Sequence, residues 1–313
     1  MFRLLVYSLY LVFFLEPFMS VTTPRTIPLL SGVSEILDDY DGFVIDLWGV
    51  MHDGEEAFPD AVNALQKLRS AGKRIVILSN APRRSDSVAE RNEELGIARD
   101  LADAVLSSGE VTWRNLKERT LPFYQKLGEK TFLIGPARDL GMKEGLPYEF
   151  VEEIGEAHFI LLTGIWDPAD TVERYDFLLK PALAKGLPMV CANPDLEVIR
   201  GGNRELCAGA VAQHYEKMGG EVQYHGKPHQ DIYRECMALL GVSDPSRVLA
   251  VGDSLRTDIA GANAAGIHGL FIAGGIHCED LHGLRSLGDM MRLVTLCDKY
   301  KEYPVAAMPV FRW

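Results

Sequence analysis

The sequence predicts an α/β fold of three layers, in which helices cover both faces of a parallel sheet. Short apolar runs alternate with segments of helical periodicity: a helical pattern over residues 61–70 precedes an apolar run over 74–78, and one over 229–240 precedes another over 247–252. This alternation is typical of strand-helix-strand units, whose strands pair in parallel. Because ligands bind at the carboxyl ends of such strands, functional side chains are expected there.

The first predicted strand, residues 42–45, is apolar and ends on Asp46. Asp46 is therefore expected at the mouth of the sheet. The chain continues from there as DLWGVMHDG, and Gly49 and Gly54 allow a sharp turn that leaves room for a ligand beside the carboxylate. A single aspartate at the end of a strand often only caps a loop, so an active site has to be supported by further motifs.

Two later segments offer groups that suit a phosphoryl oxygen. The apolar run over 74–78 ends in Ser79 and Asn80, whose hydroxyl and amide are short hydrogen-bonding groups. Lys227 lies in a Gly-Lys-Pro loop, where its ammonium group can neutralise a phosphoryl oxygen and the carboxylates around it. We interpret these segments as an anion-binding element and an electrostatic clamp.

The third predicted strand ends on Asp253, and Asp258 follows five residues later, at the start of a helix expected over 259–265. A hard cation such as Mg²⁺ and a phosphate together require carboxylates and a nearby cationic side chain. The sequence supplies carboxylates at two strand ends, with Asp46 as nucleophile, and a lysine. The set predicts a carboxylate that attacks phosphorus.

In order and spacing these four motifs resemble those of the haloacid dehalogenase-like (HAD) hydrolases. The resemblance runs from about residue 41 to 276, and its most specific piece is GDSLRTDIAGANAAGI. The stretch between Ser79 and Lys227 resembles the C2-type cap of the class IIA members, which include nitrophenyl, pyridoxal, sugar and nucleotide phosphatases. Segment 184–209 also resembles that cap, through an Asn-Pro-Asp element that by itself is an ordinary turn signal. The resemblance implies a Rossmann-like core with an inserted α/β cap.

The resemblance also implies a role for each matching residue. The groups implied to act on the phosphoryl group are the nucleophile Asp46, with Ser79 and Lys227 holding the phosphoryl oxygens. The implied Mg²⁺ ligands are Asp46, Asp253, the backbone carbonyl of Trp48, and Asp258 acting through water or Lys227. The residues expected to contact a small phosphorylated metabolite are Asn80, Trp48, His52, Asn193 and Asp195.

Trp48 departs from the family's pattern. Phosphatases of this family carry a second carboxylate two positions after the nucleophile, which protonates the leaving oxygen and later activates water. Indole has one weak donor and no acceptor, so it can do neither. General acid-base catalysis typically contributes ~10²–10⁴ in rate, so alkyl phosphates should suffer most and aryl, enol and acyl phosphates least.

Several interpretations of Trp48 remain open. Family members that cleave carbon–halogen bonds or phosphonates also lack the second carboxylate, so the bond broken can differ. A catalytically silent protein that binds a phosphometabolite between core and cap, with Trp48 stacked on the ligand, is another alternative. His52, six residues after Asp46, is a hypothetical proton donor, against the alternative of a surface loop histidine. The favoured function is a Mg²⁺-dependent phosphatase that forms an aspartyl-phosphate on Asp46.

The composition is consistent with a two-domain enzyme. The chain has 313 residues, 47% hydrophobic and 24% charged, and is long enough to bury a large core. Its net charge of −12 argues against nucleic acid or an anionic membrane surface as a main partner. We expect a core from residues 19–111 and 223–313, and an inserted cap over 112–222 with its own strands at 131–134 and 158–163. Homodimers through the cap are usual in the resembling family.

Residues 1–18 conflict with the rest of the chain. Residues 4–15 form an apolar run of signal-peptide length, but no small-residue cleavage site follows. We therefore expect translation to start at Met19 and the protein to be cytoplasmic, with export or membrane anchoring as the alternative. The cysteines are odd in number and form no CxxC pair, which favours free thiols in a reducing compartment: Cys191, Cys207, Cys236, Cys278 and Cys297.

Overall fold

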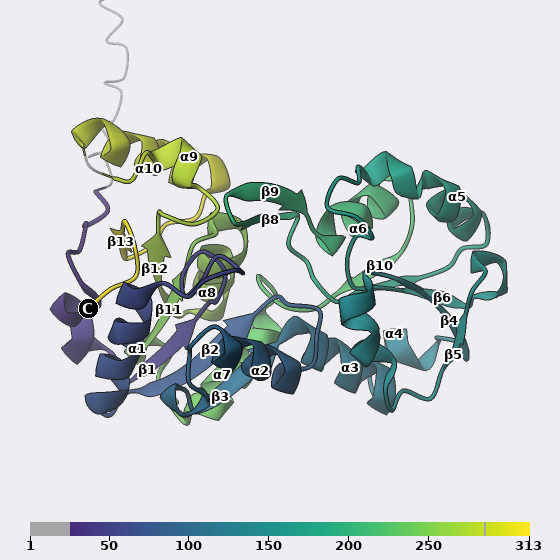
Figure 1. Cartoon of the computed structure of the whole chain (residues 1–313), viewed down its shortest axis with the longest axis horizontal. Coiled ribbons are helices and arrows are strands. Elements are labelled where there is room, and N and C mark those ends of the chain that lie inside the picture. Colours follow the sequence, from purple (N-terminus) through teal and green to yellow (C-terminus); the bar gives the residue numbers. More distant parts are fainter. Residues whose placement is uncertain (1–25, 285) are drawn as a thin grey trace, which may run out of the picture.

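The computed structural model describes residues 26–284 and 286–313. The predictions for residues 1–18 and for a start at Met19 lie outside the described residues. Figure 1 shows two lobes side by side, each built on its own parallel sheet. We call the lobe with the six-stranded sheet the core and the lobe with the five-stranded sheet the cap. The three-layer α/β fold expected from the sequence is confirmed.

The core sheet has the strand order β13-β12-β11-β1-β2-β3, and every pairing in it is parallel. Its strands are β1 (Gly42–Ile45), β2 (Arg74–Ser79), β3 (Ala104–Ser107), β11 (Val248–Gly252), β12 (His268–Ile272) and β13 (Ala306–Met308). The strands β1 and β11, which carry Asp46 and Asp253 after their ends, are direct neighbours. Because these strands are neighbours, the motifs that contain Asp46 and Asp253 lie together at one edge of the sheet.

Both faces of the core sheet are covered, because side chains alternate along each strand. On one face Phe43 and Ile45 pack with Leu65 of α1, and on the other Val44 packs with Ile232 of α7. The helices around the core are α1 (Pro59–Ser70), α2 (Ser85–Glu94), α7 (Gln230–Leu240), α8 (Ala260–Ala265), α9 (Cys278–Leu281) and α10 (Leu287–Tyr300). Short helical turns are η1 (Val33–Asp39), η2 (Arg99–Leu101), η6 (Pro245–Arg247) and the π-turn η7 (Leu255–Ile259).

The cap sheet has the order β10-β7-β6-β4-β5 and is also parallel. Its strands are β4 (Lys130–Ile134), β5 (Glu149–Val151), β6 (Phe159–Leu162), β7 (Met189–Cys191) and β10 (Val222–Tyr224). The two cap strands predicted from the sequence are present as β4 and β6. The helices of the cap are α4 (Pro122–Gln125), η3 (Ala137–Lys143), η4 (Ile154–Glu156), η5 (Val172–Tyr175), α5 (Asp176–Ala184) and α6 (Ala208–Lys217).

Two crossings connect the lobes. Helix α3 (Ser108–Glu118) leaves the core, with Val111 packed against the core and Leu116 in a cluster of the cap. The chain returns after β10 through His225, whose carbonyl accepts a hydrogen bond from the Ser108 hydroxyl at 2.7 Å. His225 also contacts the hydroxyl of Tyr124 in α4. The two crossing segments are therefore tied to each other.

A two-stranded hairpin of the cap, β8 (Glu197–Arg200) and β9 (Asn203–Leu206), reaches toward the core (Figure 1). Gly201 and Gly202 form its two-residue turn with φ values of +50° and +80°, a backbone conformation that glycine adopts readily. A side chain at Gly201 would meet the carboxyl group of Glu55 in the core, so the tip packs closely on that loop. The hairpin covers the edge of the core where Asp46 lies.

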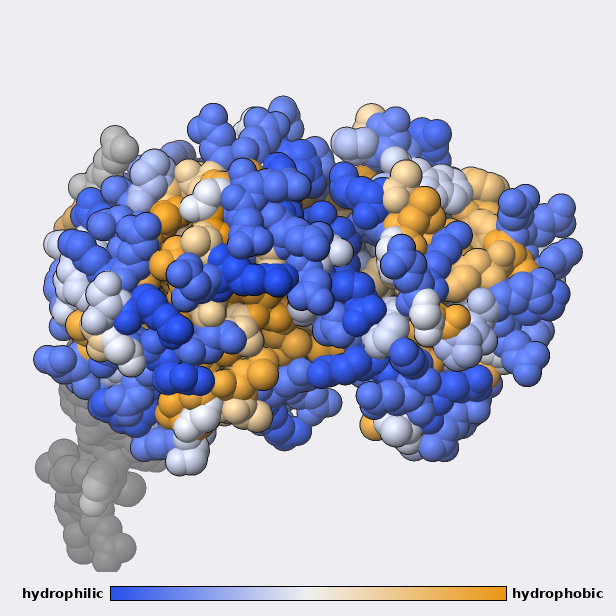
Figure 2. All heavy atoms as spheres, turned by 60° about the horizontal axis from the view of Figure 1, so that its bottom comes forward, coloured by the Kyte–Doolittle hydropathy of each residue, from blue (hydrophilic) through white to orange (hydrophobic). Residues whose placement is uncertain are grey.

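Among the described residues, no helix is both long and apolar enough to cross a membrane. Figure 2 shows mostly hydrophilic residues on the visible face of both lobes, with hydrophobic residues gathered in patches. The five cysteines are not joined in disulfides.

Candidate active site

Asp46 lies directly after β1, where its backbone N–H still donates to Val251 of β11. Its side chain is nearly buried, and one carboxylate oxygen is 2.5 Å from the Lys227 ammonium. The same ammonium is 2.8 Å from Asp258, and the Lys227 side chain is only 3% exposed. Lys227 therefore joins two buried carboxylates that come from opposite ends of the core sequence.

Asp46, Asp253 and Asp258 each offer a carboxylate oxygen, and these oxygens lie within 4.8 Å of one another. Asp253 follows β11 and accepts a hydrogen bond from the Ile276 N–H at 2.7 Å. The helical segment begins at Leu255, earlier than the sequence indicated, so Asp258 lies within the π-turn η7. Its carboxylate accepts a hydrogen bond from the Ser254 N–H at 3.1 Å. Three clustered carboxylate oxygens are the ligand type that Mg²⁺ prefers.

The backbone approaches Asp253 so closely that two glycines are required. A Cβ atom at Gly275 would lie 2.0 Å from an Asp253 carboxylate oxygen, and one at Gly49 would lie 2.1 Å from the same atom. Gly49 belongs to the turn after Asp46, as the sequence indicated. Any larger residue at these positions would displace the Asp253 carboxylate.

The charges of this site are not balanced by protein groups alone. Burial raises the pKa of Asp46 to about 7, although Lys227 opposes the shift. Burial, with the negative charges of Asp46 and Asp258, raises the pKa of Asp253 well above its usual range. Burial disfavours the charged form of Lys227, but Asp258 and Asp46 outweigh it and hold its pKa well above the ordinary value. One ammonium for three carboxylates leaves negative charge that a divalent cation would offset.

Asn80 fixes the loop that carries Lys227. Its side-chain oxygen accepts from the Lys227 N–H at 2.8 Å, and its amide donates to the Lys227 carbonyl at 3.2 Å. The amide also donates to Asp195 of the cap at 2.9 Å. Asn80 therefore positions the lysine and contacts the cap at the same time.

A cavity of about 170 Å³ lies over these groups, and we call it the carboxylate cavity. Its core residues include Asp46, Asn80, Lys227, Asp253 and Asp258, and its cap residues are 195–199. Arg256 of the core donates to the Pro194 carbonyl at 2.8 Å and lies 3.7 Å from the Asp195 carboxylate. The turn before the hairpin is thereby held against the core.

Trp48 is half-buried and forms part of the wall of the carboxylate cavity and of two neighbouring cavities. The Arg200 guanidinium lies 4.8 Å from its ring centre, a distance typical of cation–π contact. A Cβ atom at Gly54 would lie 2.1 Å from the ring, so the indole is held between the hairpin and the loop after β1.

Three predicted site residues do not line the carboxylate cavity. The Ser79 side chain is buried, and its hydroxyl accepts a hydrogen bond from the Ala81 N–H at 3.2 Å. Asn193 lines a neighbouring cavity, and its side chain accepts a hydrogen bond from the Asp195 N–H. His52 lies beside Trp48 with its ring centre 5.1 Å away, and burial lowers its pKa to about 4. Because His52 is 4% exposed, the alternative of a surface histidine is wrong.

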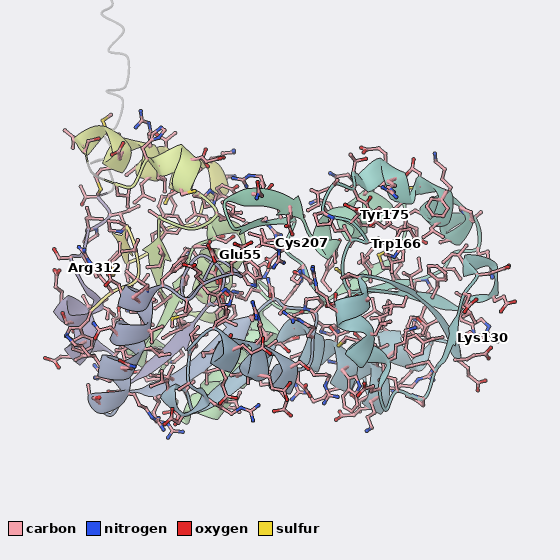
Figure 3. All side chains as sticks on the ribbon, in the orientation of Figure 1. Glu55, Lys130, Trp166, Tyr175, Cys207 and Arg312 are labelled. Atoms are coloured by element: carbon pink, nitrogen blue, oxygen red, sulfur yellow. The ribbon has the colours of Figure 1, made fainter. Side chains whose placement is uncertain are left out.

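The sequence analysis missed Arg256 and the hairpin residues that cover the site. The signal for the hairpin was present, because a Gly-Gly pair lies between two short runs of strand character. No local pattern marks Arg256 as a contact of the cap. Figure 3 shows Glu55 beneath the hairpin and Cys207 at its base, near the boundary between the lobes.

Two family models match the chain, the first over the start of the core and of the cap and the second over the later part of the core. One, described as haloacid dehalogenase-like hydrolase, matches residues 43–144, and another, described as HAD-hydrolase-like, matches residues 224–289. These segments contain Asp46, Lys227, Asp253 and Asp258.

Among curated proteins, the chain is 27% identical to a D-glycerol 3-phosphate phosphatase of Mycobacterium tuberculosis, over 78% of this chain and 66% of that protein. It is 29% identical to chronophin of Rattus norvegicus, over 76% of this chain and 77% of that protein. A solved haloacid dehalogenase-like hydrolase from Brucella suis 1330 is 35% identical, with a TM-score of 0.75 over 90% of this chain and 98% of that one. The chain therefore belongs to the haloacid dehalogenase-like hydrolases, among their class IIA members.

Proposed function

We propose that this protein is a Mg²⁺-dependent phosphatase that hydrolyses a small phosphate ester through its Asp46 carboxylate. The observation that carries the proposal is the buried cluster in which Asp46 lies beside Lys227 and within 4.8 Å of two further carboxylates. Named phosphatases among the relatives support the same reaction class.

In this proposal an Asp46 oxygen attacks phosphorus, the alcohol leaves, and water then hydrolyses the aspartyl-phosphate and regenerates the carboxylate. Lys227 stabilises negative charge on the phosphoryl oxygens, because its ammonium is buried and already fixed beside Asp46. Asn80 holds the Lys227 backbone in place. A phosphoryl contact by Ser79 stays a prediction.

The donor set fits a resident Mg²⁺. We assign it to the carboxylates of Asp46 and Asp253 and the backbone carbonyl of Trp48, with Asp258 supporting it through water or Lys227. When bound, Mg²⁺ supplies positive charge that favours ionised Asp46 and neutralises the phosphoryl oxygens.

Trp48 sets the substrate preference in this proposal. Since indole cannot donate a proton to the leaving oxygen and then accept one from water, the leaving group has to depart largely unaided. His52 does not replace the missing acid, because its ring lies in the wall of another cavity and its lowered pKa keeps it neutral near pH 7. Aryl, enol and acyl phosphates are therefore the expected substrates.

We place the cap at residues 112–222 and the core at 19–111 and 223–313. The contacts of Asn80 with Asp195 and of Arg256 with Pro194 support a cap that closes over the carboxylate cavity. Closure would exclude water from the reacting groups. A cytoplasmic location and a homodimer through the cap stay predictions.

Phosphate release tests the proposal, on protein begun at Met19, with Mg²⁺ and a panel of alkyl, aryl, enol and acyl phosphates. We expect turnover that favours good leaving groups, is lost on chelation of the metal, and falls to background in Asp46→Asn. Silence across the panel would overturn the phosphatase assignment. Carbon–halogen and phosphonate substrates would then be tested, together with equilibrium binding of phosphometabolites.

A further inference from the structure

Three cavities meet at Trp48. Beside the carboxylate cavity lies a second, of about 90 Å³, which we call the interlobe cavity because core residues such as Ala81 and cap residues such as Trp166 line it. A third, of about 150 Å³, lies behind Trp48 between the start of the loop after β1 and helix α2, and we call it the arginine cavity. Both are well above the ~10–15 Å³ that one water requires.

Three arginines line both the interlobe and the arginine cavity: Arg83, Arg138 and Arg200. They come from separate places, since Arg83 follows β2 in the core, Arg138 lies in η3 and Arg200 ends strand β8. Arg91 of α2 adds a fourth guanidinium to the arginine cavity. The fold therefore gathers four cations at one place in a protein whose net charge is −12.

Ion pairs with described residues reach two of these four cations and leave the other two without one. Arg200 pairs with Glu205 at 3.1 Å and Arg91 with Glu94 at 2.7 Å, but the side chains of Arg83 and Arg138 form no hydrogen bond or ion pair with another described residue. Burial lowers the pKa of Arg83; Asp139 opposes this, and Arg138, Arg200 and Arg91 lower it further. These guanidinium groups repel one another, and an anion bound between them would relieve the repulsion.

Two buried polar atoms nearby also lack partners. Asn92, which is 3% exposed, lines the arginine cavity, and its side-chain amide nitrogen has no acceptor among the described residues. One oxygen of Asp139, which is 2% exposed, has no hydrogen bond, and burial raises the pKa of this carboxyl to about 6. Asp139 lines only the interlobe cavity, and no carboxylate lines the arginine cavity. An unsatisfied donor and unpaired guanidinium groups together favour an anionic ligand.

We propose that the substrate carries a second anionic group, a carboxylate or a phosphate, and that Arg83, Arg138 and Arg200 bind it while the transferred phosphoryl group lies against Asp46. The inference rests on the phosphatase function proposed above. The body of the substrate passes through the interlobe cavity along Trp48, which borders all three cavities. Arginine suits this task because its planar fork binds carboxylate or phosphate through two hydrogen bonds.

Matched aryl phosphates test the inference: para-carboxyphenyl phosphate, para-phenylene bisphosphate and the uncharged para-carbamoylphenyl phosphate. The wild-type enzyme should prefer an anionic member, and the preferred one identifies the second group. In Arg83→Gln and Arg138→Gln, kcat/KM for that substrate should fall about 10- to 100-fold, mainly through KM. The carbamoyl substrate should change by no more than about twofold. Arg234→Gln, at an exposed pair with Asp231, is the matched control.

Equal use of the three esters by the wild-type enzyme, or equal losses on all three in the variants, would overturn the inference while leaving the phosphatase function intact. Calorimetry with non-hydrolysable ligands covers the case in which no ester is turned over. The wild-type protein should bind para-(phosphonomethyl)benzoate more tightly than benzylphosphonate, and Arg83→Gln should remove the difference. Equal affinities, or no binding of the benzoate, would reject the second-anion site.

Discussion

The edge of the core sheet gathers carboxylates, whereas the boundary between the lobes gathers arginines. At the sheet edge, the Lys227 ammonium is buried and contacts two carboxylates at 2.5 and 2.8 Å. At the boundary, Arg83 is half-buried and Arg138 is exposed, and neither side chain forms an ion pair with another described residue. The first region has more carboxylates than ammonium groups. In the second region, the arginine cavity is lined by four arginines and no carboxylate, whereas the interlobe cavity is lined by as many carboxylates as arginines. A cation would offset the charge of the three carboxylates, and an anion would offset the charge of the arginines.

Under the two proposals made above, this difference separates the chemistry from the recognition of the substrate. Groups at the sheet edge are fixed by β1, β11 and the Asn80 contacts, so their geometry changes little with the rest of the ligand. Groups at the boundary come from core and cap together, so their spacing depends on how the lobes meet. Trp48 lies in the wall shared by the two regions, and in the function proposed above its indole stands where a carboxylate would assist the reaction.

The largest expected effect comes from removing the buried cation. Lys227→Met leaves Asp46 and Asp258 without their shared partner, and loss of one member of a buried pair typically costs 3–5 kcal/mol. We expect roughly that loss in the free energy of unfolding, measured by denaturant titration without metal. Turnover should fall by about 10²–10³-fold, as when a preorganised electrostatic donor is removed.

A surface pair gives the matched control for this change. Lys180 lies 2.9 Å from Asp176 on α5, with its side chain 67% exposed. Lys180→Met should cost less than about 1 kcal/mol, because solvent screens exposed pairs. Similar losses in the free energy of unfolding of the two variants would show that burial does not make the ion pairs at the sheet edge more important than a surface pair.

A second prediction concerns the residue shared by both regions. Trp48→Asp restores a carboxylate two positions after the nucleophile, so turnover of an alkyl phosphate should rise by about 10²-fold. An aryl phosphate with a good leaving group should gain much less. Loss of the half-buried indole should destabilise the fold by less than the roughly 3–5 kcal/mol that truncation of a fully buried tryptophan costs.

The matched variant is Trp48→Asn, which has nearly the same shape as the aspartate but cannot exchange a proton. Steady-state rates on ethyl phosphate and nitrophenyl phosphate compare the two. If asparagine accelerates the alkyl substrate as much as aspartate does, the indole acts by filling space, and the missing acid is not the limiting factor.

The smallest expected effect tests the crossing between the lobes. Burial lowers the pKa of His225 from 6.5 to about 4, so the unfolded chain binds a proton more readily than the folded protein below pH 6.5. Stability is therefore fully present above that pH and is lost as the pH falls toward 4. Between pH 7 and pH 5 His225 should contribute a loss of roughly 1–2 kcal/mol, since one pKa unit corresponds to about 1.4 kcal/mol.

Denaturant midpoints at pH 7 and pH 5 measure this contribution. His225→Gln should show a smaller pH dependence than the wild-type protein, while His282→Gln, at an exposed position, should show the same dependence. An unchanged slope in His225→Gln would mean that other groups, and not the crossing segment, carry the acid sensitivity.

Much of the core could be predicted from the sequence, because neighbouring residues along the chain encode it. Apolar runs and helical periodicity gave the strands β1, β2 and β11 and their flanking helices, and the residues that end these strands gave Asp46, Asn80 and Asp253. In a parallel sheet every carboxyl end lies at the same edge, so motifs far apart in sequence were expected to meet. The structure places them in one cavity.

The sequence predicted the orientation of individual side chains less well than the positions of the strands. Ser79, His52 and Asn193 are close in sequence to residues of the site, yet none of them lines the carboxylate cavity. Their side chains are fixed by local contacts, such as the Ala81 N–H on Ser79 and the Gly54 N–H on His52. Nearness along the chain does not determine which side of a loop a side chain takes.

The sequence by itself determined the fold class, the strand-end carboxylates and the absence of an acid at position 48, because each is a property of one short segment. Only the tertiary structure decided that the hairpin covers Asp46 and that Arg83, Arg138 and Arg200 converge behind Trp48. Those residues are separated by tens of residues and belong to different lobes. Their meeting depends on the packing of cap against core, which no local periodicity encodes.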